Sequence, residues 1–161
     1  MNAGLPFSVR RATIADAEGI LDCLRSAFQP YRRDYTDAAF ADTVLTRDTL
    51  PQRLATMAVF VATTGDGAVV GTVACEVLAG GEGHLRGMAV CPGWQGGGIA
   101  QRLLEAAESE LWERKCSRIR LETTAPLRRA MRFYERNGFR PSGTVTDFFG
   151  MPLFEYVKPV G

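Results

Sequence analysis

The sequence predicts an α/β fold built on a mixed, mostly antiparallel central sheet with helices on both faces. Two turn-rich segments in mid-chain, Thr64–Gly67 and Ala79–Gly83, separate β-compatible runs, which is typical of hairpins and antiparallel pairing. The stretch from His84 to Thr123 then reads strand, glycine-rich turn, helix and strand, and this order requires a parallel crossover. Apolar residues at helical spacing before and within this stretch predict the helices that cover the two faces of the sheet.

The N-terminal third is predicted to begin with a short strand over Phe7–Ala12, followed by a helix that Thr13 and Asp16 start and Pro30 ends. Apolar residues recur at helical spacing along this helix: Ile20, Leu21, Leu24 and Phe28. A polar and aromatic segment follows. We expect it to contain a second helix within 36–45 and a shorter one before Met57.

The rest of the chain is predicted to alternate between strands and helices. The expected strands cover 57–62, 68–78, 84–90, 118–123, 142–146 and 154–158. One helix covers 99–115 with an apolar side, and another covers 127–137 with Gly138 as its C-terminal cap. Because no repeat or low-complexity linker interrupts this order, a single domain over 1–161 is predicted.

The composition argues against several classes of protein. A chain of 161 residues with 46% hydrophobic content is typical of one globular domain that needs no disulfide staple. A net charge of +1 argues against nucleic-acid binding, and no apolar run is long enough to span a membrane. Four scattered cysteines and one histidine make no zinc set. With no leader pattern at the N-terminus, we expect a cytoplasmic, metal-free protein that could form a homodimer.

Basic residues gather late in the chain. Residues 113–140 contain nine Arg or Lys and three Glu. This excess fits a solvated helical face, and it also fits a positive field for a polyanionic cofactor.

The most informative motif is the glycine-rich turn at 90–100, which reads V-C-P-G-W-Q-G-G-G-I-A. A helix start carries unpaired N–H groups and the positive end of a dipole, and glycines let an anion approach that backbone. The turn is therefore predicted to bind a phosphate or pyrophosphate. A Walker loop is excluded because Ile99 follows Gly98, and the dinucleotide fingerprint fails because Gln101 occupies its third glycine position.

Two motifs together resemble the GNAT family of N-acetyltransferases. The first is Gln95-x-x-Gly98-x-Ala100, which is similar to the family's acetyl-CoA signature. The second is the segment 130–139, A-M-R-F-Y-E-R-N-G-F, which is similar to the family's A-x-x-x-Y-E-x-x-G-F. The motifs and the strand order cover the chain from about Phe7 to Val157. The resemblance implies the family's fold, in which parallel strands 4 and 5 splay apart and hold the pantetheine arm of acetyl-CoA.

The resemblance also implies which residues bind acetyl-CoA. The strand before the turn would offer backbone groups to the pantetheine, and the turn would offer N–H groups to the pyrophosphate. The residues so assigned are Met88, Ala89, Val90, Gln95, Gly96, Gly97, Gly98, Ile99 and Ala100. One departure concerns Leu127, because the family often has an asparagine there that contacts the cofactor.

Tyr134 and His84 are the candidate catalytic residues. The resemblance places Tyr134 beside the cofactor sulfur, where its phenol could protonate the departing thiolate. The alternative is a core aromatic residue. His84 stands at a strand position where related enzymes carry a general base, and imidazole suits that task near neutral pH. Strand alternation predicts that His84, Arg86 and Met88 share one face. The alternatives are a solvent-facing histidine, with the base supplied by a chain of water molecules or by one of three carboxylates: Glu76, Glu82 or Glu122.

The acceptor amine is only loosely constrained by the sequence. In the family, the connection between the first two helices and the last hairpin line the acceptor site. Tyr31, Tyr35 and Phe148 occupy those segments here and could bind an apolar or ring-bearing amine, or could simply pack. The sequence thus favours acetyl transfer from acetyl-CoA to a primary amine of a small molecule or peptide, by direct attack in a ternary complex. The rivals are a non-catalytic acyl-CoA sensor and a nucleotide-phosphate enzyme of another fold.

Overall fold

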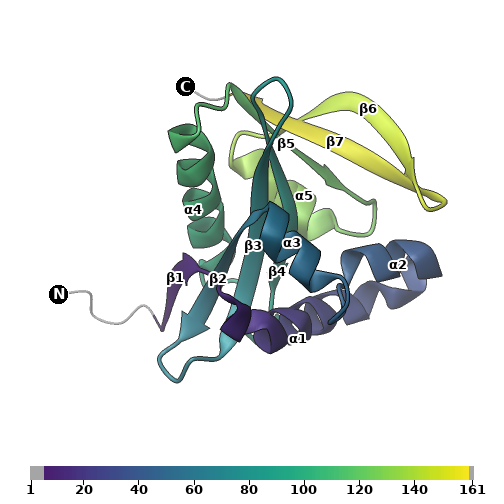
Figure 1. The fold of residues 1–161 in the computed structure, drawn as a ribbon. Helices are drawn as coiled ribbons and strands as arrows, with labels where there is room; N and C mark the ends of the chain where they lie inside the picture. The colour runs from purple at the N-terminus through teal and green to yellow at the C-terminus, as the bar shows by residue number, and fades with distance from the viewer. Residues whose placement is uncertain (1–5, 160–161) are drawn as a thin grey trace.

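The computed structural model describes residues 6–159 and confirms the predicted α/β architecture. A single seven-stranded sheet has the order β1-β2-β3-β4-β5-β7-β6. Every neighbouring pair is antiparallel except β4 and β5, which are parallel. In Figure 1, α4 stands on one side of the sheet and α1, α2 and α3 lie on the other.

The strands are β1 (Phe7–Arg11), β2 (Ala58–Thr64), β3 (Val69–Leu78), β4 (Glu82–Val90), β5 (Arg118–Thr123), β6 (Arg140–Phe148) and β7 (Met151–Pro159). The α-helices are α1 (Ala17–Phe28), α2 (Asp37–Thr43), α3 (Leu50–Thr56), α4 (Ile99–Glu113) and α5 (Arg128–Arg136). Short 3₁₀ turns cover Ile14–Asp16, Gln29–Asp34 and Pro92–Trp94. No helix within residues 6–159 is long and apolar enough to cross a membrane.

The start of the first helical region follows the predicted capping pattern. The carboxylate of Asp16 accepts a hydrogen bond of 2.8 Å from the backbone N–H of Thr13, and it also pairs with Arg10. The prediction that Pro30 ends the helix is wrong in detail. Helix α1 ends at Phe28 and the chain continues as a 3₁₀ turn, with Pro30 in its first positions, where a missing N–H removes no helical hydrogen bond.

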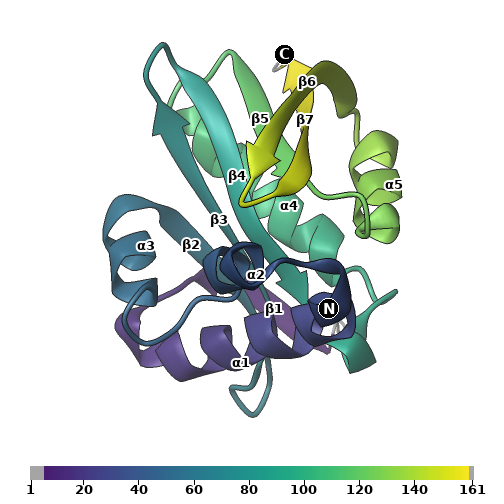
Figure 2. The same ribbon diagram turned by 90° about the vertical axis from the view of Figure 1, so that its right-hand side faces the viewer.

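Two apolar layers lie on opposite faces of the sheet. On one face α4 packs against β1, β2, β3 and β4, and its fully buried residues include Leu103, Leu104 and Leu111. On the other face α1 packs against β3 and β4 through Ile20 and Leu24. Figure 2 shows the second face, with α1, α2 and α3 toward the viewer and the β6–β7 hairpin above them.

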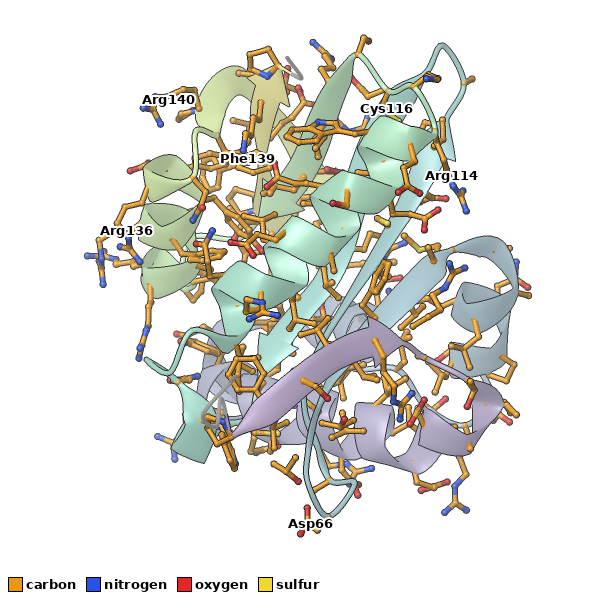
Figure 3. All side chains as sticks on the ribbon, turned by 90° about the vertical axis from the view of Figure 1, so that its left-hand side faces the viewer. Asp66, Arg114, Cys116, Arg136, Phe139 and Arg140 are labelled. Carbon is orange, nitrogen blue, oxygen red and sulfur yellow. The ribbon has the colours of Figure 1, made fainter. Side chains whose placement is uncertain are left out.

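Helix α5 and the segment after it close the α4 side of the sheet. Gly138 follows the helix with a φ of 93°, the left-handed conformation expected of its capping position. Phe139 comes next, is fully buried, and lies between α5 and α4 in Figure 3. Arg136, in contrast, points away from the molecule on the outer side of α5 (Figure 3).

The parallel strands β4 and β5 pair over three positions only and then separate. Their pairs are Glu82 with Arg118, Gly83 with Ile119, and His84 with Arg120. Beyond these pairs, no described residue pairs with the β5-facing edge of β4. The parallel pair therefore opens toward the glycine-rich turn, as the resemblance implied.

A bulge in β4 overturns the expected alternation of side chains. Between Arg86 and Ala89, β4 has one residue more than the facing part of β3, and Gly87 takes a φ of 63° there. Arg86 consequently faces α2, where it pairs with Asp42, whereas Met88 packs against the apolar layer under α4. The prediction that His84, Arg86 and Met88 share one face is wrong, because the extra residue reverses the alternation.

The two last strands are longer than predicted. Strand β6 runs over Arg140–Phe148 and forms the edge of the sheet, and all but one of its residues are exposed. Such an edge strand has no apolar face to mark its ends in the sequence. Backbone pairing with β7 holds it instead.

Candidate functional site

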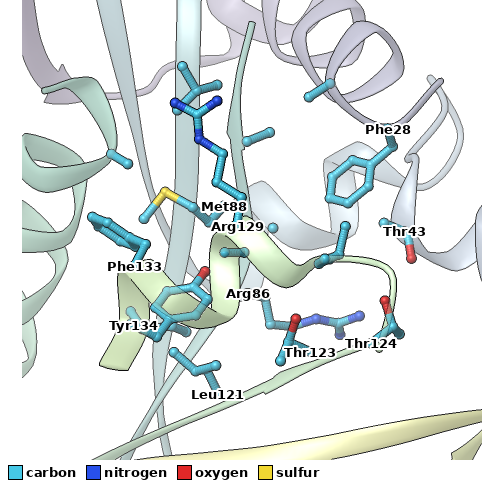
Figure 4. Close-up of a pocket in the computed structure, with 18 of the residues that line it drawn as sticks. Phe28, Thr43, Arg86, Met88, Leu121, Thr123, Thr124, Arg129, Phe133 and Tyr134 are labelled. Carbon is cyan, nitrogen blue, oxygen red and sulfur yellow. The ribbon is translucent and has the colours of Figure 1, made fainter. Parts of the chain in front are cut away.

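The space between the separated strands is the main cavity of the described structure. Its volume is about 730 Å³, a size typical of small-molecule sites. Residues of β4 and β5 form two of its walls, the glycine-rich turn and α5 close one end, and α1, α3 and the β6–β7 hairpin contribute to the other. Figure 4 shows the cavity between these elements.

The glycine-rich turn presents its backbone N–H groups without acceptors. Within residues 6–159, none of the six consecutive amides from Gly96 to Gln101 donates a hydrogen bond to another protein group. The first helical bond runs from the amide of Arg102 to the carbonyl of Gly98, at 3.1 Å. A run of free donors at a helix start is the backbone arrangement that binds an anion.

The glycines of this turn are required by its conformation. Gly96 and Gly98 have φ values of 83° and 88°, which other residues adopt only with strain. A Cβ at Gly98 would meet no atom within 4 Å, so its outer side is open to a ligand. At the end of β5, the hydroxyl of Thr123 is buried at the cavity wall and has no hydrogen-bond partner in the described part of the chain. Free amides, open glycines and an orphaned hydroxyl all fit a bound polar ligand such as acetyl-CoA.

Arg129 of α5 adds a cation to the turn. Its Nη1 donates to the side-chain oxygen of Gln95 at 3.1 Å, and its Nη2 would lie 3.7 Å from a Cβ at Gly96. Sequence reasoning did not single out Arg129. The only signal was the excess of basic residues over 113–140, which did not say which side chain faces the turn.

Tyr134 lies where the two separated strands and α5 meet. The residue is 7% exposed, and its ring contacts Phe133 and Phe139 edge to face. Its hydroxyl has no acceptor within residues 6–159 and points into the cavity (Figure 4). Burial raises the pKa of the Tyr134 phenol above its ordinary value, so this group stays protonated at neutral pH. Tyr134 therefore packs as a core aromatic residue and also presents a free hydroxyl to the cavity.

His84 lies between two carboxylates at the point where β4 and β5 separate. Its Nδ1 is 3.2 Å from Glu76 Oε2 on β3, and its Nε2 is 3.1 Å from both oxygens of Glu122 on β5. A neutral imidazole can donate to only one carboxylate, whereas the protonated ring can donate to both. Both ring nitrogens therefore have a carboxylate partner, and the ring also lines the cavity. The alternative of a solvent-facing histidine is wrong, because the residue is 9% exposed.

Glu122 is the carboxylate beside His84 whose pKa is lowered. Burial acts to raise the pKa of this carboxyl, but the hydrogen bond and charge of His84, together with Arg120, outweigh burial and lower it. The carboxylate is therefore ionised across the neutral range, next to the imidazole.

The predicted acceptor residues line the other end of the cavity. Tyr31, Tyr35 and Phe148 all contribute to it, together with Phe28 of α1. The hydroxyl of Tyr35 is 2.6 Å from Oγ1 of Thr124, the residue after β5, and its ring packs against Phe28. Tyr35 thus combines a packing role with a place at the cavity wall.

The cavity brings together nearly all the residues assigned from the sequence. Gly97 is the exception, since a Cβ there would face the carbonyl of Trp94 and the residue does not line the cavity. Leu127 lines the wall at the start of α5 and offers no side-chain hydrogen bond. In the part of the chain that the structure describes, no group of three or more His, Cys, Asp or Glu side chains is placed to hold a metal ion.

Comparison with known proteins gives one family. The model of the acetyltransferase (GNAT) family matches residues 18–139, which is more than half of the chain. None of the curated protein sequences matches significantly.

Solved structures share the fold over nearly the whole chain. An acetyltransferase of the GNAT family from Staphylococcus aureus has a TM-score of 0.79 at 19% identity, covering 96% of this chain and 99% of that one. The PaiA N-acetyltransferase of Thermoplasma acidophilum, in complex with coenzyme A, has a TM-score of 0.78 at 19% identity with the coverages 96% and 99%. A ribosomal-protein-alanine N-acetyltransferase from Brucella melitensis has 0.76 at 24% identity, with 95% and 99%. At these identities the similarity establishes the fold.

Proposed function

Because this chain belongs to the GNAT acetyltransferase family, we propose that it transfers the acetyl group of acetyl-CoA to a primary amine of a small molecule or peptide, by direct attack in a ternary complex. One observation carries this proposal. The free amides of the glycine-rich turn, the free hydroxyl of Tyr134 and the His84 cluster all open onto the same cavity. Acetyl-CoA supplies an activated acyl group as a thioester.

The residues that would hold acetyl-CoA come from the glycine-rich turn, α5 and β4. The amides from Gly96 to Gln101 bind the pyrophosphate, and Arg129 adds a positive charge beside them. The unpaired edge of β4 at Met88, Ala89 and Val90 offers backbone groups to the pantetheine amides, as a neighbouring strand would. Met88 and Val90 also pack against the apolar layer under α4, which fixes this edge in place.

Tyr134 is the proposed general acid. Its hydroxyl is protonated, points into the cavity and has no competing acceptor among the described residues, so it can donate a proton to the departing thiolate. Edge-to-face packing against Phe133 and Phe139 holds the ring in this orientation.

His84 and Glu122 together form the proposed base. An acceptor amine is a cation near neutral pH and must lose a proton before it attacks. The two carboxylates around His84 attract that cation, and the neutral imidazole accepts its proton and is then stabilised by donating to both carboxylates. Glu122 also fixes the orientation of the ring.

The direct test is release of the CoA thiol from acetyl-CoA with a panel of amines: polyamines, amino acids, aminoglycosides and peptides with free N-termini. We expect at least one class to raise thiol release well above hydrolysis, with the acetylated amine detected by mass spectrometry. Tight binding of acetyl-CoA without thiol release for any amine would contradict the enzyme and favour an acyl-CoA sensor.

A further inference from the structure

Arg53 of α3 lies against the bulge in β4. A Cβ placed on Gly87 would lie 2.6 Å from Arg53 Nη1, so the guanidinium lies directly against the backbone of that residue. Any side chain at position 87 would displace it. The glycine in the bulge therefore makes room for this arginine at the cavity wall.

The charge of Arg53 is not neutralised by a contacting group. Within residues 6–159, no carboxylate lies within ion-pair distance of its guanidinium, which also donates no hydrogen bond. Arg86, its neighbour on β4, is paired with Asp42 at 3.2 Å. Burial, followed by the like charge of Arg86, outweighs the opposite charges of Asp42 and Glu76 and lowers the pKa of Arg53 to about 10, so the group is still a cation at neutral pH.

The position of this cation is not that of an ordinary surface arginine. Arg53 is half-buried and lines both the main cavity and a smaller adjoining one of about 270 Å³. A cation without a partner in a partly desolvated site is costly unless an anion arrives. Within the described chain, the guanidinium of Arg53 lies unpaired at the acceptor end of the cavity.

The same end of the cavity holds the opposite charge. Glu76 and Glu122 flank His84, and Glu76 also lines the smaller cavity together with Arg53. A carboxylate cluster attracts an ammonium group, while an unpaired guanidinium attracts a carboxylate. The two features lie near one another, which matches a molecule that carries both charges close together.

We propose that the acceptor bears a carboxylate next to its amine, as an amino acid does, and that Arg53 binds this carboxylate. The proposal rests on the amine acetylation put forward above and narrows it to one class of acceptor. Phe28, Tyr31 and Phe148 line the same end, so an aromatic amino acid is a suitable probe alongside a small one.

The first experiment compares amines that differ only in the carboxylate. Thiol release is measured with phenylalanine, phenylalaninamide and phenethylamine, and with alanine and alaninamide. We expect kcat/KM to be at least tenfold higher for the acids than for their amides. Equal or faster turnover of the carboxylate-free amines would overturn the proposal while leaving amine acetylation intact.

Substitutions then assign the preference to Arg53. Arg53→Met keeps much of the apolar stem of the side chain and removes its charge, so KM for the acids should rise at least tenfold while the amides change little. Arg53→Lys keeps the charge and should retain part of the preference. The control is Arg47→Met, because Arg47 is exposed, pairs with Glu18 and lines neither cavity. A preference that survives in Arg53→Met, with the fold intact, would overturn the assignment.

A binding measurement separates this proposal from the reaction itself. Calorimetry with the CoA-loaded protein compares N-acetylphenylalanine with N-acetylphenylalaninamide. If no amine is turned over but the acid alone binds, and Arg53→Met abolishes that binding, the carboxylate site stands and the proposed reaction fails. If neither compound nor any acid in the panel binds or reacts, the carboxylate site is wrong.

Discussion

Nε2 of His84 on β4 lies 3.1 Å from both carboxylate oxygens of Glu122 on β5, and this contact bridges the two parallel strands where they begin to separate. The strands share no further backbone pairs beyond His84 and Arg120. The side-chain bridge is therefore the last link before the cavity, and it fixes the imidazole at the cavity wall.

His84→Gln should change the pH dependence of the reaction. In the wild type, kcat/KM should rise with pH, because only the neutral imidazole can accept the amine proton. The variant should lose this rise and need a higher pH, at which the amine is already free. The lowered pKa of Glu122 keeps that carboxylate ionised throughout, so the rise cannot come from its titration.

Two further variants control this pH measurement. Glu122→Gln should lower kcat and alter the profile, because the imidazolium loses a charged acceptor. Glu82→Gln should leave the profile unchanged, since Glu82 pairs with Arg118 and Arg120 and does not line the cavity. An unchanged profile in both His84→Gln and Glu122→Gln would move the base to another group or to water.

Gly98→Glu should weaken acetyl-CoA binding by more than about tenfold, or ~1.4 kcal/mol. The substitution places a negative charge where the pyrophosphate is expected, and it also strains a residue with a φ of 88°. Gly67→Glu is a matched control, because Gly67 also has a φ of 88° and open space around it but lies in the β2–β3 turn. Calorimetry measures the acetyl-CoA affinity of both variants. An equal loss of affinity in the two would contradict the assignment of the turn as the pyrophosphate site.

Tyr134→Phe should lower kcat by roughly 100-fold, the usual scale of acid catalysis, and leave acetyl-CoA affinity nearly constant. The change deletes the hydroxyl and keeps the ring that packs against Phe133 and Phe139. Tyr156→Phe is the control, since Tyr156 is also buried but donates to Glu135 at 3.3 Å and does not line the cavity. A steady-state kcat that is equal in wild type and Tyr134→Phe would leave Tyr134 as a packing residue only.

Arg129→Gln should raise KM for acetyl-CoA several-fold and reduce its dependence on salt, because one cation is lost beside the free amides. kcat at saturating acetyl-CoA should change little. Arg132→Gln removes the same charge from an exposed position of α5 that does not line the cavity. KM for acetyl-CoA is measured from initial rates at low and high salt for both variants. If KM changes equally in the two, the assignment of Arg129 to acetyl-CoA binding is wrong.

The sequence predicted the parts of the site that are encoded locally. A strand, a glycine-rich turn and a helix within 84–113 are continuous in the chain, and their order alone places free amides at the start of α4. The motif around Tyr134 is also a single segment. The length of β6 escaped prediction because an edge strand carries no alternating apolar face.

Residues brought together by tertiary packing were not predicted. Arg53 precedes β4 by two strands and reaches Gly87 only in the folded chain, and the one available signal was a glycine inside a strand pattern. The same bulge reversed the face of Met88, which simple alternation could not foresee. Glu122 was one of several candidate carboxylates until β4 and β5 were placed side by side.

The most direct test of the account is the fate of a labelled acetyl group. The protein is mixed with [¹³C]acetyl-CoA with and without an amine that it accepts, and both protein and amine are examined by mass spectrometry. Direct attack in a ternary complex predicts no thiol release and no labelled protein without the amine, and one thiol released for each labelled amine formed. A labelled protein formed before the amine is added, or thiol release that no amine increases, would contradict it.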